Sequence, residues 1–157
     1  MAQHSKKDQI AQAALPLFLE HGIKGTSVDM VVKASGVSKP TVYNHFQDKS
    51  HLLRYVVECW LQAQPTPVFQ AKSAVALIKE MNKHWFSAEA CRLYGLCFGE
   101  GARAPSAVKL FLEQYDQPWR AALKERSETL NLATDPLQAT ASHRLLASLI
   151  EPLLTTR

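Results

Sequence analysis

A group of hydrogen-bond donors, nearly free of acidic side chains, occupies residues 36–49. The segment follows a Gly36-Val37 corner, and Val42 and Phe46 have the spacing of one buried helical face. The remaining side chains therefore point outward, where they suit phosphate oxygens and the edges of bases. They are Ser38, Lys39, Thr41, Tyr43, Asn44, His45 and Lys49.

These side chains have chemically defined partners on double-stranded DNA. Lys39 can donate to the acceptors of guanine, and Pro40 or Thr41 can lie against a thymine methyl group. His45 is interpreted as a donor to phosphate, because no second ligand stands at metal spacing. Asp48 would repel phosphate and is therefore assigned to capping a helix.

Other chemistries find no support in the pattern. There is no His-Glu-x-x-His, no glycine-rich phosphate loop, no cysteine pair at zinc spacing and no nucleophile elbow. Cys59, Cys91 and Cys97 are an odd, sparse set in apolar contexts, which indicates reduced thiols. We expect no enzymatic activity, no catalytic residue, no metal and no cofactor.

Four helices are predicted to carry the donors. Helical periodicity covers residues 5–21, Ser27 caps a helix that ends near Ala34, Ser38 caps the next, and Asp48 caps a connecting helix over about 48–62. Together the second and third form a helix-turn-helix.

A break at residues 65–67, Pro-Thr-Pro, precedes further helices at about 68–85, 87–100, 105–131 and 135–154. We expect an all-α protein with a three-helix DNA-binding domain over 1–47 and a helical dimerisation domain over 48–157.

Overall charge does not locate the site. The net charge is +4, and residues 1–60 carry seven basic against five acidic side chains, while the remainder carries eleven against nine. No stretch approaches the roughly 18 apolar residues of a membrane span, and no signal peptide is evident, so we expect a cytoplasmic protein without membrane partners.

Residues 8–57 carry a more specific pattern. Ala14 to Phe18, residues 25–28 (Gly-Thr-Ser-Val), the run from Gly36 to Phe46, and then Lys49 and residues 52–53 (Leu-Leu) closely resemble the TetR family of bacterial transcriptional regulators. The resemblance implies an N-terminal DNA-binding module, a helical domain that binds a ligand and dimerises, and association with the bacterial nucleoid.

The resemblance also implies roles for individual residues. Pro40 replaces the glycine of most members, and Asp29 stands where some relatives place a basic, base-contacting residue, which argues against base contacts from that helix. The positions that touch DNA in relatives correspond to Ser27, Lys39, Pro40, Thr41, Tyr43, His45 and Lys49.

Two sets of apolar residues in the second domain admit two interpretations each. By resemblance, one set encloses a small lipophilic effector: Met81, Trp85, Tyr94, Phe98, Phe111, Tyr115 and Trp119. An aromatic stripe at helical spacing is also typical of plain core. The other set forms an apolar face wide enough for a dimer interface, or serves the chain's own core: Leu130, Leu145, Leu146, Leu149, Ile150 and Leu153.

Two functions follow from these interpretations. The first is a ligand-responsive, dimeric repressor that binds a palindromic operator through two recognition helices. The alternative is an effector-independent DNA-binding, architectural or protein-interaction module whose helical body is solid core.

Overall fold

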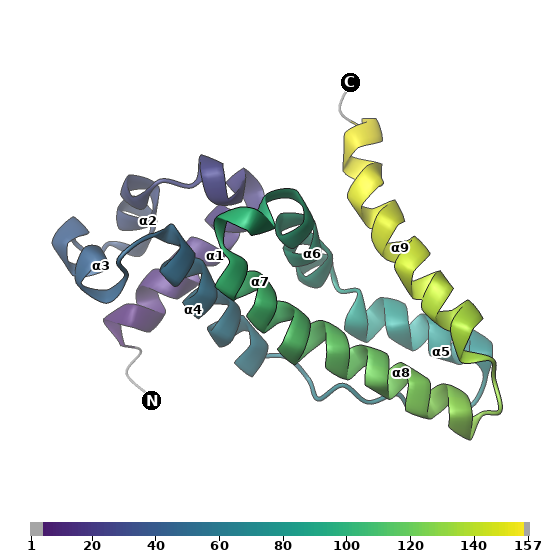
Figure 1. Ribbon diagram of the computed structural model, residues 1–157. Helices are drawn as coiled ribbons and strands as arrows, with labels where there is room; N and C mark the ends of the chain where they lie inside the picture. Colours follow the sequence, from purple (N-terminus) through teal and green to yellow (C-terminus); the bar gives the residue numbers. More distant parts are fainter. Residues whose placement is uncertain (1–4, 156–157) are drawn as a thin grey trace. The chain divides into compact units, whose positions relative to one another are not determined.

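The structure, a computed structural model, describes the backbone of residues 5–155 and the side chains of residues 5–147. Every regular element in that backbone range is helical, which confirms the all-α class (Figure 1). The α-helices are α1 (Lys6–Gly25), α2 (Val28–Ser35), α3 (Lys39–His45), α4 (Lys49–Gln62), α5 (Ala74–Glu80), α6 (Ala88–Glu100), α7 (Pro105–Phe111), α8 (Gln117–Thr129) and α9 (Thr134–Thr155). Between them stand the π-helical turns η1 (Met81–Trp85) and η3 (Leu112–Asp116) and the 3₁₀ turn η2 (Gly101–Arg103).

The chain divides into two compact units. The first unit comprises the residues up to Gln64 together with Leu96–Leu112, and the second comprises Pro65–Gly95 and the residues from Glu113 onward. The first unit therefore contains α1 to α4 and also α7, a helix from much later in the sequence. The first change of unit falls at the Pro-Thr-Pro break of residues 65–67.

Helix α1 begins at a reciprocal cap and contains a break. The amide of Asp8 donates to Ser5 Oγ, and the amide of Ser5 donates to the Asp8 carboxylate, each over 3.1 Å. The helix runs to Gly25, beyond the predicted end at residue 21, but Gly22 (φ 72°, ψ −179°) interrupts its helical geometry. Because φ is positive there, glycine is the residue that fits.

The core of the first unit joins α1, α2, α3, α4 and α7. Phe18, Val31, Val42 and Val56 are buried in it, and for Val42 the helical spacing predicted this. Gly36 adopts the left-handed conformation (φ 67°) at the corner between α2 and α3. Helix α4 packs against both α1 and α7.

The prediction of a helix from residue 68 is wrong for its first six positions. Residues 65–71 have no regular structure, and α5 begins only at Ala74, behind its Ser73 cap. Two side chains bind the peptide groups of this segment instead. Arg126 donates to the carbonyls of Ala71 (2.6 Å) and Gln70 (3.1 Å). Glu80 accepts from the amides of the same two residues, at 3.1 and 2.9 Å.

The later helices were predicted closely. The regions 87–100, 105–131 and 135–154 correspond to α6, to α7–η3–α8 and to α9. Within the described part of the chain, none of the helices is both long enough and apolar enough to cross a membrane.

Candidate nucleic-acid interface

Helix α3 turns two apolar side chains inward and its polar side chains outward. Val42 and the C-cap residue Phe46 are 2% and 4% exposed. The predicted DNA contacts at Ser38, Lys39, Pro40, Tyr43, Asn44 and His45 are all exposed, and Thr41 is partly exposed. No acidic residue occurs among the residues of α3. The exposed polar face that the sequence predicted for residues 38–45 therefore lies on the short helix α3 and its N-cap residue.

Two of the predicted contacts also serve as helix caps. Ser27 Oγ accepts from the amide of Met30 over 3.2 Å at the start of α2. Ser38 Oγ accepts from the amide of Thr41 over 3.4 Å and lies 2.8 Å from the Thr41 hydroxyl. These bonds fix where α2 and α3 begin, and so which side chains of each helix lie outward.

Lys39 is paired with an acidic side chain across the helix-turn-helix. Its Nζ lies 2.8 Å from Asp29 Oδ1, and the two side chains are 52% and 74% exposed. The hydrogen bond from Lys39 to Asp29 and the negative charge of Asp29 raise the pKa of the lysine. The sequence drew attention to Asp29 as a departure from the family, but it did not reveal this pairing.

Lys49, another predicted DNA contact, binds backbone within the first unit. Its Nζ donates to the carbonyl oxygens of Ile23 (2.7 Å) and Lys24 (3.4 Å), in the turn that follows the break at Gly22. An ammonium group has three donor hydrogens, so one remains for a further partner. A phosphate contact from Lys49 stays a prediction.

Glu100, the last residue of α6, binds the backbone amides of the same turn. Its carboxylate accepts from the amides of Ile23 and Lys24, the latter at 3.2 Å. A Cβ at Gly22 would collide with this carboxylate. Nothing in the sequence indicates that Glu100 has a partner 77 positions away.

A cluster of side chains ties α3 and α4 to α1. The Tyr55 hydroxyl donates to Asp8 Oδ1 over 2.8 Å, and this bond raises the pKa of the tyrosine. The ring of Tyr55 lies 5.6 Å from that of Phe46, and Lys7 Nζ lies 3.9 Å from the Tyr55 ring centroid. The orientation of α3 thus depends on packing and on charge.

In the second unit, four of the predicted effector residues form an aromatic cluster, defined here as Trp85, Tyr94, Tyr115 and Trp119. All four are at most 2% exposed. The Trp85 and Trp119 rings are stacked at 6.5 Å, and the Tyr115 and Trp119 rings meet edge-on at 6.4 Å.

A hydrogen-bond chain runs through the aromatic cluster. Trp85 Nε1 donates to the Tyr94 hydroxyl (3.0 Å), which donates to Asp116 Oδ1 (2.7 Å). Arg120 Nε donates to the other oxygen of Asp116 (2.7 Å), and the Tyr115 hydroxyl donates to the Trp85 carbonyl (2.6 Å). Burial and the neighbouring Asp116 raise the pKa of Tyr94, which keeps its hydroxyl protonated.

The other predicted effector residues lie elsewhere. Met81 is buried in η1 of the second unit. Phe98 and Phe111 belong to the first unit, where Phe98 is 67% exposed and the Phe111 ring lies 6.0 Å from that of Trp60. A role of this set in binding an effector stays a prediction.

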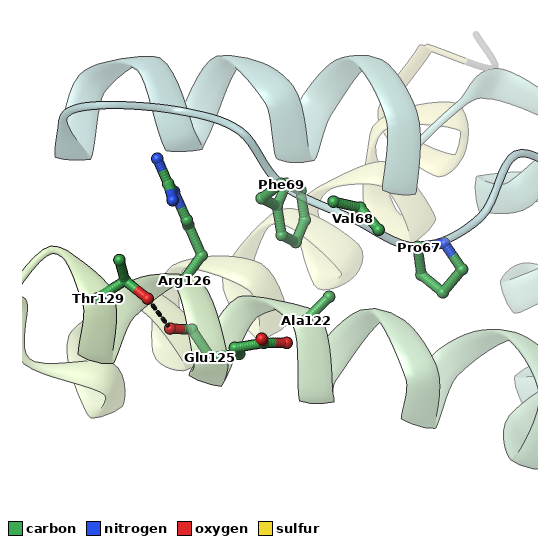
Figure 2. Close-up of a pocket in the computed structure, with 7 residues that line it drawn as sticks. All are labelled: Pro67, Val68, Phe69, Ala122, Glu125, Arg126 and Thr129. Carbon is green, nitrogen blue, oxygen red and sulfur yellow. Dashed lines mark hydrogen bonds between the residues drawn. The ribbon is translucent and has the colours of Figure 1, made fainter.

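Hollows in the second unit lie along the irregular segment. One of about 180 Å³, drawn in Figure 2, lies between residues 67–69 and the Ala122–Thr129 stretch of α8, with Arg126 reaching up from the helix. A second, of about 290 Å³, is lined by Gln70, Glu80, His84 and Trp119, among others. Both are smaller than the roughly 300–1,000 Å³ usual for ligand pockets.

The predicted dimer surface is described only in part. Leu145 is buried, Leu130 is partly exposed and Leu146 is 57% exposed. The side chains of Leu149, Ile150 and Leu153 lie outside the described residues. The interface stays a prediction.

The three cysteines do not form disulfides with one another. Cys59, Cys91 and Cys97 are free thiols, and burial raises the pKa of Cys97 to about 12. Within the described residues, no three His, Cys, Asp or Glu side chains gather in a way that could hold a metal ion.

Known proteins similar to this chain include transcriptional regulators. Residues 10–56 match the sequence model of the bacterial regulatory proteins of the tetR family. Over 52 residues the chain is 36% identical to an HTH-type transcriptional regulator of Staphylococcus aureus, a match that covers 33% of this chain and 28% of the relative. The chain thus matches less than a third of the length of that curated relative.

Solved structures resemble the chain over most of its length. A protein of Mesorhizobium loti assigned to the TetR family of transcriptional regulators has a TM-score of 0.64 at 23% identity, over 92% of this chain and 83% of that one. MexZ, a repressor responsible for antibiotic resistance in Pseudomonas aeruginosa, has a TM-score of 0.60 at 18% identity, over 91% and 82%. The fatty acid degradation regulator FadR of Bacillus halodurans has a TM-score of 0.61 at 18% identity, over 100% and 90%.

The fold is therefore that of helix-turn-helix transcriptional regulators with a helical C-terminal region. The match of residues 10–56 to the tetR family of bacterial regulatory proteins confirms the resemblance that the sequence predicted for the N-terminal module.

Proposed function

We propose that this protein is a dimeric transcriptional repressor that binds a palindromic DNA operator through α3 and leaves it when a small molecule binds the second unit. The observation that supports DNA binding most directly is the outward, acid-free face of α3 above the buried Val42 and Phe46. Two such helices about 34–36 Å apart in a dimer would contact successive major grooves.

Selection from a pool of randomised duplexes, followed by fluorescence anisotropy with the selected site, tests the DNA-binding part. Asn44→Ala removes an exposed amide from α3 and should weaken binding to that site by about 5- to 150-fold if the amide contacts adenine. Gln117→Ala removes an exposed amide from the start of α8 and should leave binding unchanged. Failure of the wild-type protein to enrich any sequence would refute the proposal.

Dimerisation is tested by sedimentation. The chain has a mass of 17.5 kDa, and a dimer should sediment at twice this mass. Leu146→Glu places a charge on an exposed leucine of α9 and should favour the single chain. If the wild-type protein sediments as one chain at micromolar concentration, the two-headed mechanism is wrong.

A second candidate function, DNA binding without any effector, also has an observation in its favour. Because the aromatic cluster packs on itself and its hydroxyl and indole groups have partners, the second unit also fits an effector-independent DNA-binding protein with a solid core. Thermal shift against a library of small lipophilic compounds separates the two. At 100 times its Kd a ligand adds about 2.7 kcal/mol. In a chain of this size that raises the Tm by roughly 5–10 °C, and no shift with any compound favours the effector-independent protein.

A further inference from the structure

We propose that Asp29 is a specificity-determining residue. Its carboxylate holds the Lys39 ammonium at the base-contacting face of α3 and reduces the attraction of that ammonium to the phosphates of unrelated DNA. The inference rests on the proposed function and extends it to how the protein distinguishes its own site from other sequences.

The geometry places the pair where it acts on DNA. Asp29 stands in the first turn of α2, and Lys39 is the first residue of α3, so the pair bridges the two helices of the helix-turn-helix. The 2.8 Å distance is that of a charge-assisted hydrogen bond. Both side chains are more than half exposed, and they accompany the exposed Tyr43 and Asn44 of α3. The pair is therefore accessible to an approaching duplex.

The charges act differently on matched and unmatched DNA. An ammonium that gives one hydrogen to Asp29 retains two, enough for the O6 and N7 acceptors of a guanine. Because Asp29 restrains the direction of the ammonium, this contact needs little further ordering. On a duplex without that guanine, the Lys39 ammonium is attracted only to phosphates. The negative charge of Asp29 offsets the positive charge of Lys39 and so weakens this attraction.

The size of the effect follows from counterion release. Each cation that neutralises a phosphate contributes about 0.9 to the slope of log affinity against log salt concentration. Freeing Lys39 from Asp29 should therefore steepen the slope on unrelated DNA by about 0.9, which at 0.15 M salt corresponds to a roughly fivefold rise in affinity.

The test compares four proteins on two fluorescein-labelled duplexes. One duplex carries the site that the wild-type protein selects from a randomised pool, and the other has the same length and composition with the site scrambled. The variants are Asp29→Asn, Lys39→Met and the double substitution. Glu20→Gln is the control, because it removes the same charge from α1 at a side chain that is 72% exposed. Circular dichroism verifies that each variant is folded.

Asp29→Asn should raise affinity for the scrambled duplex about fivefold, steepen its salt slope by about 0.9, and lower the ratio of site to scrambled affinity by a similar factor. In the Lys39→Met background the same change should have no more effect than Glu20→Gln. An unchanged ratio, or an equal rise in both backgrounds, would overturn the inference while leaving DNA binding intact. If the wild-type protein selects no site, the proposed function itself fails, and that outcome is visible before any variant is compared.

Discussion

Replacing Glu100 with alanine should destabilise the first unit through the turn after Gly22. The carboxylate accepts from the amides of Ile23 and Lys24, and its side chain is 26% exposed. Ile23 is 3% exposed, so its amide would be left without a partner and shielded from water, at a cost of about 1–3 kcal/mol. The exposed amide of Lys24 can turn to water and adds little.

A loss of about 2 kcal/mol should lower the Tm by roughly 4–8 °C in a chain of this size. Urea unfolding gives the free energy of unfolding, and hydrogen exchange locates the change, since the amides of Ile23 and Lys24 should exchange faster than in the wild-type protein. Glu100→Gln retains one carbonyl oxygen that can accept from Ile23 and should recover part of the lost stability.

Glu128→Ala is the matched control, because it removes an exposed glutamate from α8 and should change stability by no more than about 0.5 kcal/mol. If Glu100→Ala is as stable as this control, the carboxylate does not hold the turn. The reasoning also fails if stability falls while the exchange of the Ile23 amide is unchanged, because the loss then arises elsewhere.

Three further changes test other parts of the structure. Gly36→Ala should cost about 1–2 kcal/mol in urea unfolding, because the added Cβ meets no atom within 4 Å and only the positive φ of 67° opposes it; a neutral change would refute this. Tyr94→Phe should cost about 1–3 kcal/mol by removing the hydroxyl donor from buried Asp116, and unchanged stability would show that the hydrogen-bond chain does not contribute. Asp48→Ala should lower the Tm most above about pH 4. Bonds from His51 lower the pKa of Asp48, so its contribution is lost as the pH falls through that lowered value. If the difference in Tm between this variant and the wild-type protein is as large at pH 2 as at neutral pH, the charged carboxylate of Asp48 is not what stabilises the protein.

Short-range sequence patterns were sufficient to predict α3 and the side chains that it exposes. The spacing of Val42 and Phe46, the Ser38 cap and the glycine at position 36 all act within ten residues, so the sequence alone indicates which side chains of α3 lie outward. The same holds for the later helices, whose boundaries depend on neighbouring caps and prolines.

Contacts between distant segments were not predictable in this way. The irregular segment before α5 has apolar residues at helical spacing, but Arg126 and Glu80 bind its peptide groups and replace the helix's own hydrogen bonds. The pairing of Lys39 with Asp29 depends on the angle between two helices, which spacing does not reveal.

The membership of Leu96–Leu112 in the first unit has a consequence for biosynthesis. Ile23 and Trp60 have partners in Glu100 and Phe111, so the packing of the first unit is incomplete until a segment 48 residues beyond Gln64 has left the ribosome. At about 5–20 residues per second that delay is roughly 2–10 s. During this interval the nascent N-terminal helices expose apolar surface that the finished protein covers. A fragment that ends at Gln64 would remain in that incomplete state, so exchange of this module between regulators should transfer Leu96–Leu112 as well.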